Sequence, residues 1–168
     1  MIIRATRKVL NLNRIKPIKN DSELNGQLPG EWYVDLISLG KTGKFALHFL
    51  HHPTKIVVIV RGRSIKKTYS KFKIHVSEFL KRNGYKNLIQ RFDLESELFI
   101  YSTNDRSMLA VMRDIKWNSE YQCLRYVNIE SIDFEWIEDI SMSNLFTTKK
   151  TGSEYLRTRD IMDGFLLK

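Results

Sequence analysis

The chain has 168 residues, of which 42% are hydrophobic and 28% are charged, and its formal net charge is +9. These values fit one soluble globular domain, so we expect residues 1–168 to form a single domain. No apolar run approaches the roughly 20 residues of a membrane span, the first residues do not resemble a signal peptide, and Cys123 has no partner for a disulfide, so we expect a cytoplasmic protein without a membrane segment.

Positive charge is concentrated in two stretches of the chain. Residues 1–20 hold six bases and no acid, and residues 55–91 hold eleven bases and one acid. Residues 92–140 reverse the balance, with four bases and eleven acids. Such asymmetry points either to a polyanionic partner or to pairing between the two halves, within the fold or between subunits.

The first 30 residues are expected to hold little regular structure. A short apolar opening leads to Thr6, which is a suitable N-cap for one or two helical turns. Pro17 and the polar residues 19–27 then predict a loop that ends at Pro29 and Gly30.

Residues 30–63 predict three consecutive β-strands, on which the rest of the chain is organised. The strands cover residues 31–39, 44–51 and 55–60, and each is rich in β-branched and aromatic side chains. The gaps at residues 40–43 and 52–54 contain Gly and Pro and are the length of hairpin turns, so the strands should form an antiparallel meander.

Both faces of this meander are apolar. Trp32 and Leu36 point to one face, whereas Tyr33 and Ile37 point to the other, and the third strand is apolar throughout. We therefore expect both faces to be covered, by helices, by the chain termini or by another subunit. A symmetric homodimer is one way to provide that cover.

A long amphipathic helix should follow, from an N-cap at Ser64 to about Arg82. Its apolar stripe consists of Ile65, Tyr69, Phe72, Val76, Phe79 and Leu80, and its opposite arc carries Lys66, Lys67, Lys73 and Lys81. A short helix over residues 87–92 and a fourth strand over residues 97–102 are expected next.

The last third of the chain predicts helices. Residues 103–105 cap an amphipathic helix that continues through Trp117 or as far as Tyr126. An acidic helix should cover residues 132–140, with Trp136 and Ile137 inward, and a terminal helix should follow the polar loop 147–153. The fold class is therefore α+β: an antiparallel sheet of at least four strands, packed with amphipathic helices.

Three short motifs resemble an uncharacterised bacterial family of small soluble proteins. They are Ile3-Arg4-Ala5-Thr6-Arg7-Lys8-Val9-Leu10, Gly30-Glu31-Trp32-Tyr33, and the run from Thr103-Asn104-Asp105-Arg106-Ser107 to Met112-Arg113-Asp114. The chain departs from the family pattern at Ala110, Val111 and Arg113. The resemblance covers nearly the whole chain and supports the architecture, and it implies no activity.

The strand-to-helix turn at residues 103–107 is a candidate anion or ligand site. Helix N-termini bind anions through free amides, and Asn104, Arg106 and Ser107 lie beside them. The alternative is an ordinary N-cap with a surface arginine. If the protein is an enzyme, Arg106, Ser107 and Asp114 are its candidate site residues, although no catalytic residue can be assigned.

The histidines do not predict a metal site. His48, His51 and His52 cluster near the second turn, but neighbouring strand residues project to opposite faces, and a structural zinc needs four converging ligands. We therefore interpret them as residues of the hairpin edge, and we expect neither a metal nor a cofactor. Cys123 lacks neighbours that would activate a thiolate.

The basic arc of the long helix is the best candidate for a nucleic-acid interface. Its residues are Arg61, Arg63, Lys66, Lys67, Lys73 and Lys81. The alternative is a solvated lysine face. Three functions remain open: a non-catalytic interaction protein that binds a protein partner or itself, which we favour; a weak, sequence-independent nucleic-acid-binding protein; and an enzyme with a site within residues 103–114.

Overall fold

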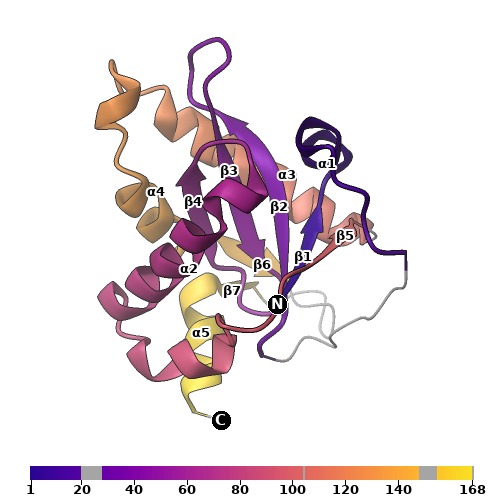
Figure 1. The fold of residues 1–168 in the computed structure, drawn as a ribbon. Helices are drawn as coiled ribbons and strands as arrows, with labels where there is room; N and C mark the ends of the chain where they lie inside the picture. Colours follow the sequence, from indigo (N-terminus) through magenta and orange to yellow (C-terminus); the bar gives the residue numbers. More distant parts are fainter. Residues whose placement is uncertain (20–27, 104, 148–154, 168) are drawn as a thin grey trace.

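The computed structural model describes residues 1–19, 28–103, 105–147 and 155–167, and it contains a five-stranded sheet covered by helices (Figure 1). The strand order is β4-β3-β2-β1-β5. The strands are β1 (Ile2–Ala5), β2 (Glu31–Ser38), β3 (Phe45–His51), β4 (Val57–Arg61) and β5 (Phe99–Ser102). The predicted α+β class is confirmed, as are the antiparallel β2-β3-β4 meander and the fourth predicted strand, β5.

The opening residues form a central strand that the sequence did not predict. β1 lies between β2 and β5 and pairs with both of them in parallel, so the sheet is mixed. Four residues are too few to show a period of two, and Arg4 in the middle of them reads as a surface residue. The helix after Thr6 is α1 (Arg7–Asn13), whose Val9 and Leu10 are buried.

One face of the sheet packs against α2 (Ile65–Arg82), which lies in front of the sheet in Figure 1, together with α1 and the 3-10 helix η1 (Lys86–Phe92). The predicted stripe of α2 is buried except for Tyr69, which is half-buried. The ring of Phe72 meets Trp32 edge-on, with centroids 4.9 Å apart, and stacks on Phe49 at 4.1 Å. These three rings form the centre of this core.

The other face packs against α3 (Arg106–Cys123), η2 (Ile129–Ser131) and α4 (Phe134–Ser141). Tyr33, Ile37 and Ile59 of the sheet are buried there among Met112 and Ile115 of α3. Helices therefore cover both apolar faces. A second subunit is not required for that purpose, so any dimer must use a different surface.

One prediction about the last third of the chain was wrong, and one element was not predicted. Trp136 does not point inward but is 39% exposed, with the guanidinium of Arg125 5.5 Å from its ring. The buried stripe of α4 is Phe134, Ile137, Glu138 and Ser141, and Trp136 lies outside it. Moreover, a hairpin of β6 (Leu145–Thr147) and β7 (Tyr155–Arg157) flanks the predicted polar loop, whose remaining residues lie outside the described part of the chain. The terminal helix is α5 (Thr158–Leu166).

The interpretation of His48 and His51 as hairpin-edge residues was also wrong, because both side chains are fully buried on opposite faces of β3. The Nδ1 atom of His51 lies 2.7 Å from the Thr54 hydroxyl, and its Nε2 lies 2.7 Å from the Pro29 carbonyl. Burial lowers the pKa of His51 to about 3 and that of His48 to about 4. Both imidazoles are therefore neutral in the folded protein at pH 7.

A buried ion pair joins β1 to the start of β2. Arg4 Nε donates to Glu31 Oε2 at 2.6 Å, and Arg4 Nη2 donates to Glu31 Oε1 at 3.0 Å. Neither side chain is more than 3% exposed, and the guanidinium also lies 5.5 Å from the ring of Tyr101 on β5. The pair thus links three adjacent strands of the sheet.

Breaking this pair should strongly destabilise the protein. Glu31→Gln removes the carboxylate charge that faces the buried Arg4 guanidinium, so the free energy of unfolding should fall by about 3–5 kcal/mol in urea titration. The double variant Arg4→Met with Glu31→Leu should recover most of the loss, because both charges are removed together. Neutralising the exposed Arg113–Asp114 pair is the matched control and should leave the unfolding midpoint unchanged. A small effect of Glu31→Gln would contradict this account.

Acid should destabilise the fold through His51. The unfolded imidazole takes up a proton below about pH 6.5, whereas the folded one stays neutral down to about pH 3, so stability falls as the pH drops between these values. His51→Gln retains a donor and an acceptor but cannot titrate. From about pH 7.5 to about pH 5, the wild type should lose about 2 kcal/mol more unfolding free energy than this variant. Equal losses of unfolding free energy in the wild type and in His51→Gln, measured by urea titration at the two pH values, would refute the assignment.

Candidate functional site

The side chain of Asp105 caps the N-terminus of helix α3. The carboxylate of Asp105 accepts hydrogen bonds from the backbone N–H of Ser107 at 2.7 Å and of Met108 at 3.2 Å. The Ser107 hydroxyl also donates to the same oxygen, at 2.7 Å. Burial opposes ionisation, but these hydrogen bonds hold the pKa of Asp105 below its ordinary value. The turn therefore already carries a negative charge supplied by the chain itself.

This geometry bears on the anion site predicted at Asn104, Arg106 and Ser107. Asn104 lies outside the described residues, and Arg106 and Ser107 are exposed. The two amides that an incoming anion would use are bonded to Asp105, and the Ser107 hydroxyl is engaged as well. The arrangement matches the alternative stated above, an ordinary N-cap with a surface arginine.

A hollow of about 710 Å³ lies between the start of α3 and the β6–β7 hairpin. Its volume is in the range of ligand-binding pockets. Two of the three enzyme candidates, Ser107 and Asp114, line it, and Arg106 does not. Other side chains that line it are His52, Lys55, Met108, Trp117, Leu145 and Tyr155.

The polar groups in this hollow are not arranged for nucleophilic catalysis. The Ser107 hydroxyl donates to a carboxylate that is already used as a cap, and Lys55 Nζ donates to the His52 carbonyl at 2.6 Å. Burial, followed by the charge of Lys55, lowers the pKa of His52, so its ring is neutral at pH 7. No hydrogen bond between a nucleophile and a base is found among the described lining residues.

The outer face of α3 carries a ridge of exposed apolar side chains, Trp117, Tyr121 and Leu124, which we call the α3 ridge. Their exposed fractions are 71%, 56% and 64%. The rings of Trp117 and Tyr121 stack with centroids 6.1 Å apart and an interplanar angle of 17°. This ridge was not predicted from the sequence. The three residues are spaced by four and then three positions, which places them on one face of the helix, opposite the buried Met108, Met112 and Ile115. This spacing in the sequence could have revealed the ridge.

Polar contacts beneath the α3 ridge fix the helix to the sheet. Lys116 Nζ lies 2.7 Å from Asp35 Oδ2 on β2, and the Thr6 hydroxyl donates to Asp35 Oδ1 at 2.7 Å. A smaller hollow of about 200 Å³ opens beside these residues and is also lined by Trp117. Trp117 thus stands between two hollows on a firmly held helix.

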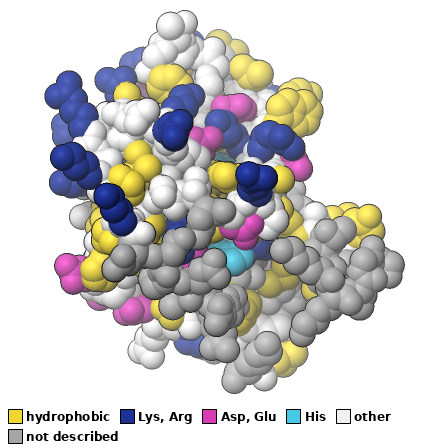
Figure 2. Space-filling model, turned by 90° about the vertical axis from the view of Figure 1, so that its right-hand side faces the viewer, with side chains coloured by type: hydrophobic (Ala, Val, Ile, Leu, Met, Phe, Trp, Pro, Cys, Tyr) yellow, Lys and Arg dark blue, Asp and Glu magenta, His cyan; other side chains and the backbone are white. Residues whose placement is uncertain are grey.

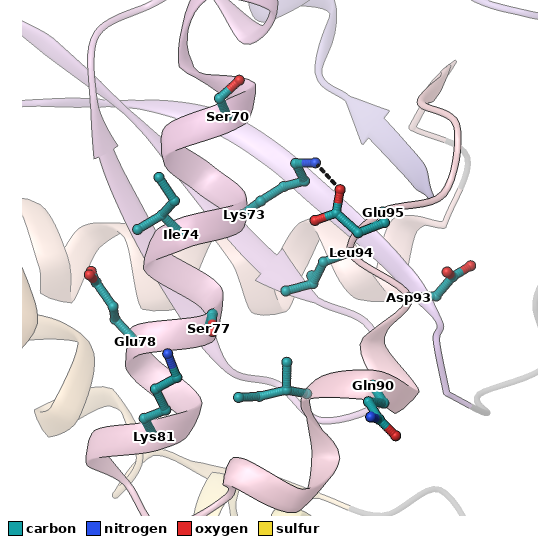
Figure 3. A pocket seen from close by; sticks show the side chains of 11 residues that line it. Ser70, Lys73, Ile74, Ser77, Glu78, Lys81, Gln90, Asp93, Leu94 and Glu95 are labelled. Atoms are coloured by element: carbon teal, nitrogen blue, oxygen red, sulfur yellow. Dashed lines mark hydrogen bonds and ion pairs between the residues drawn. The ribbon is translucent and has the colours of Figure 1, made fainter.

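The six residues of the predicted nucleic-acid interface do not form one continuous surface in the structure. Lys73 forms an ion pair with Glu95 at 2.8 Å, across a groove of about 730 Å³ between α2 and η1 (Figure 3). Lys81 lines the same groove together with Glu78, so its surface is mixed in charge. Arg61 lies 4.8 Å from the Phe134 ring and donates to the carbonyls of Glu130 and Ile132.

The other three residues of the predicted arc lie together. Arg63, Lys66 and Lys67 are exposed at the N-terminal end of α2, which is the end that contacts α1. Figure 2 faces the α1 side of the molecule and shows Lys and Arg side chains gathered over its upper left half.

Three further features were sought among the described residues: a metal site, a reactive thiolate and a membrane-spanning helix. Over the ranges given above, no group of three or more His, Cys, Asp or Glu side chains could hold a metal ion. The Cys123 thiol is buried, and burial raises its pKa to about 11, so it is not a thiolate at pH 7. Within the same ranges, every helix is too short or too polar to cross a membrane.

The three motifs noted in the sequence meet in the fold. Arg4 of the first motif pairs with Glu31 of the second, and the Thr103 amide of the third donates to the Ala5 carbonyl at 3.2 Å. No curated protein matches the chain. A family model described as a domain of unknown function, DUF6933, matches residues 2–157. The chain therefore belongs to the DUF6933 family.

Proposed function

We propose that this protein acts through protein–protein contacts, without catalysis, and that the α3 ridge pairs with the same ridge of a second copy of the chain. The observation that carries the proposal is the exposure of Trp117, Tyr121 and Leu124 on one helix face. A contiguous apolar patch of this kind is uncommon on a monomer and is typical of an interaction site. Trp and Tyr are also the residues most enriched among interface side chains that dominate affinity.

The exposed apolar surface is large enough for a stable contact. Leu145 and Tyr155, each 61% exposed, lie at the rim of the adjacent hollow and extend the ridge. Large aromatic side chains bury about 150–250 Å² each. Together these five residues supply much of the roughly 800 Å² per partner that a standard interface buries.

A second copy is the partner that this surface fits. Steps of four and three residues place the ridge in a seam, and two such seams can pair in an antiparallel arrangement about a twofold axis. The charges beside the seam are neutralised locally, because Arg113 lies 3.6 Å from Asp114 and Lys116 pairs with Asp35. Two chains of net charge +9 can therefore approach along this face without facing like charges directly.

Removing the ridge should dissociate the dimer. In sedimentation velocity, the wild type should form a dimer at tens of micromolar, and Trp117→Ser should weaken the association at least about tenfold, because an aromatic anchor is lost. Ile74→Ser on α2 is the matched control, since Ile74 is 55% exposed but lies outside the ridge, and it should leave the association unchanged.

Two results would overturn the proposal. One is a wild-type protein that stays monomeric at hundreds of micromolar. The other is a dimer that survives both Trp117→Ser and the double variant Trp117→Ser with Tyr121→Ser while circular dichroism shows both variants to be folded.

A further inference from the structure

Two long segments of the chain contain no acidic residue, and the fold brings them together. Residues 1–20 and residues 36–77 hold neither Asp nor Glu. The first segment includes α1, and the second includes the β2–β3 turn and the N-terminal half of α2. The sequence shows two basic stretches, but it does not show that they lie close together in the fold.

The side chain of Asn13, at the end of α1, joins α1 to the start of α2. Its Nδ2 donates to the Arg63 carbonyl at 2.8 Å, and its Oδ1 accepts from the Ile65 amide at 3.1 Å. On the other side of α1, the Lys8 ammonium lies 5.5 Å from the centre of the Phe45 ring. The Phe45 carbonyl in turn accepts from the Gly62 amide at 3.2 Å. These contacts tie α1, the start of β3 and the start of α2 into one surface.

Six exposed basic residues lie on or directly beside these contacts, and we call them the junction patch: Lys8, Arg14, Lys44, Arg63, Lys66 and Lys67. No acidic residue lies in the first turn of α2. The patch therefore differs from the rest of the predicted arc, where Lys73 and Arg61 are held by Glu95 and by the residues around Phe134.

We infer that the junction patch binds the phosphate backbone of double-stranded nucleic acid without sequence preference. Several positive groups gathered on one face are what phosphate neutralisation requires. Single strands are bound mainly by base stacking on exposed aromatic rings, and the one ring among these contacts, Phe45, is half-buried beneath Lys8. Stable membrane anchoring needs an apolar face in addition to positive charge, and the six patch residues do not supply one.

This inference is independent of the proposed self-association. Five of the six patch residues lie on or beside α1 and the start of α2, which cover one face of the sheet, whereas the α3 ridge belongs to the opposite layer. Lys44, the sixth, lies in the β2–β3 turn. A contact through α3 would leave the other five open, and a monomer would carry them equally well.

The salt dependence of duplex binding tests the patch. Fluorescence anisotropy should show weak, comparable binding of a DNA duplex and an RNA duplex of mixed sequence at about 50 mM salt, with a slope of log K against log salt approaching about −5 if all six residues meet phosphates. Reversing three patch charges, Arg63→Glu, Lys66→Glu and Lys67→Glu, should reduce the magnitude of the slope by about 3.

A matched triple variant separates local charge from net charge. Lys81→Glu, Lys86→Glu and Arg106→Glu make the same change in net charge at exposed positions outside the patch, and the slope should stay near that of the wild type. Equal losses in the two triple variants would overturn the inference, as would absence of duplex binding by the wild type at about 50 mM salt. Tighter binding to anionic lipid vesicles or to polyglutamate than to either duplex would also overturn it.

Discussion

The buried pair of Arg4 and Glu31 is the constraint on which the sheet depends. A guanidinium and a carboxylate removed from water stabilise a structure only while both are present and bonded, so the pair fixes β1 in one register against β2. That register brings Thr6 to Asp35, and Asp35 to Lys116 of α3. One electrostatic requirement near the start of the chain thus propagates to the position of a helix about 80 residues later.

The two helical layers differ in the surfaces they present to solvent. The layer of α1 and α2 is basic, and its apolar residues are almost all used in the core around Trp32 and Phe72. The layer of α3 and α4 has both signs of charge, and it retains apolar side chains that the core does not use, Trp117 and Tyr121 above all. Each layer therefore suits a different class of contact, and the sheet between them keeps those contacts apart.

Local patterns in the sequence were sufficient for most of the elements. The meander, α2, α3 and α4 were all predicted, because β-branched runs, helical stripes and capping residues are visible in a short window. The features that were missed or wrongly predicted depend on residues that are distant in the sequence. β1 is a strand because Glu31 and Phe99 lie on either side of it, and His48 and His51 are buried because helices cover both faces of β3. The charges of the predicted basic arc could be counted from the sequence, but the pairing of Lys73 with Glu95 and the contact of Arg61 with the Phe134 ring result from packing.

The central position of β1 also determines when the domain can form during synthesis. β1 is synthesised before its second partner, β5, which is made about 95 residues later. Until then, one edge of β1 carries unpaired backbone groups and the Arg4 guanidinium lacks the ring of Tyr101. Closing such a long loop slows folding, and a nascent chain that ends before β5 would expose an unpaired strand edge. The same topology that places β1 inside the sheet of the finished protein delays the pairing of its second edge until β5 has been made.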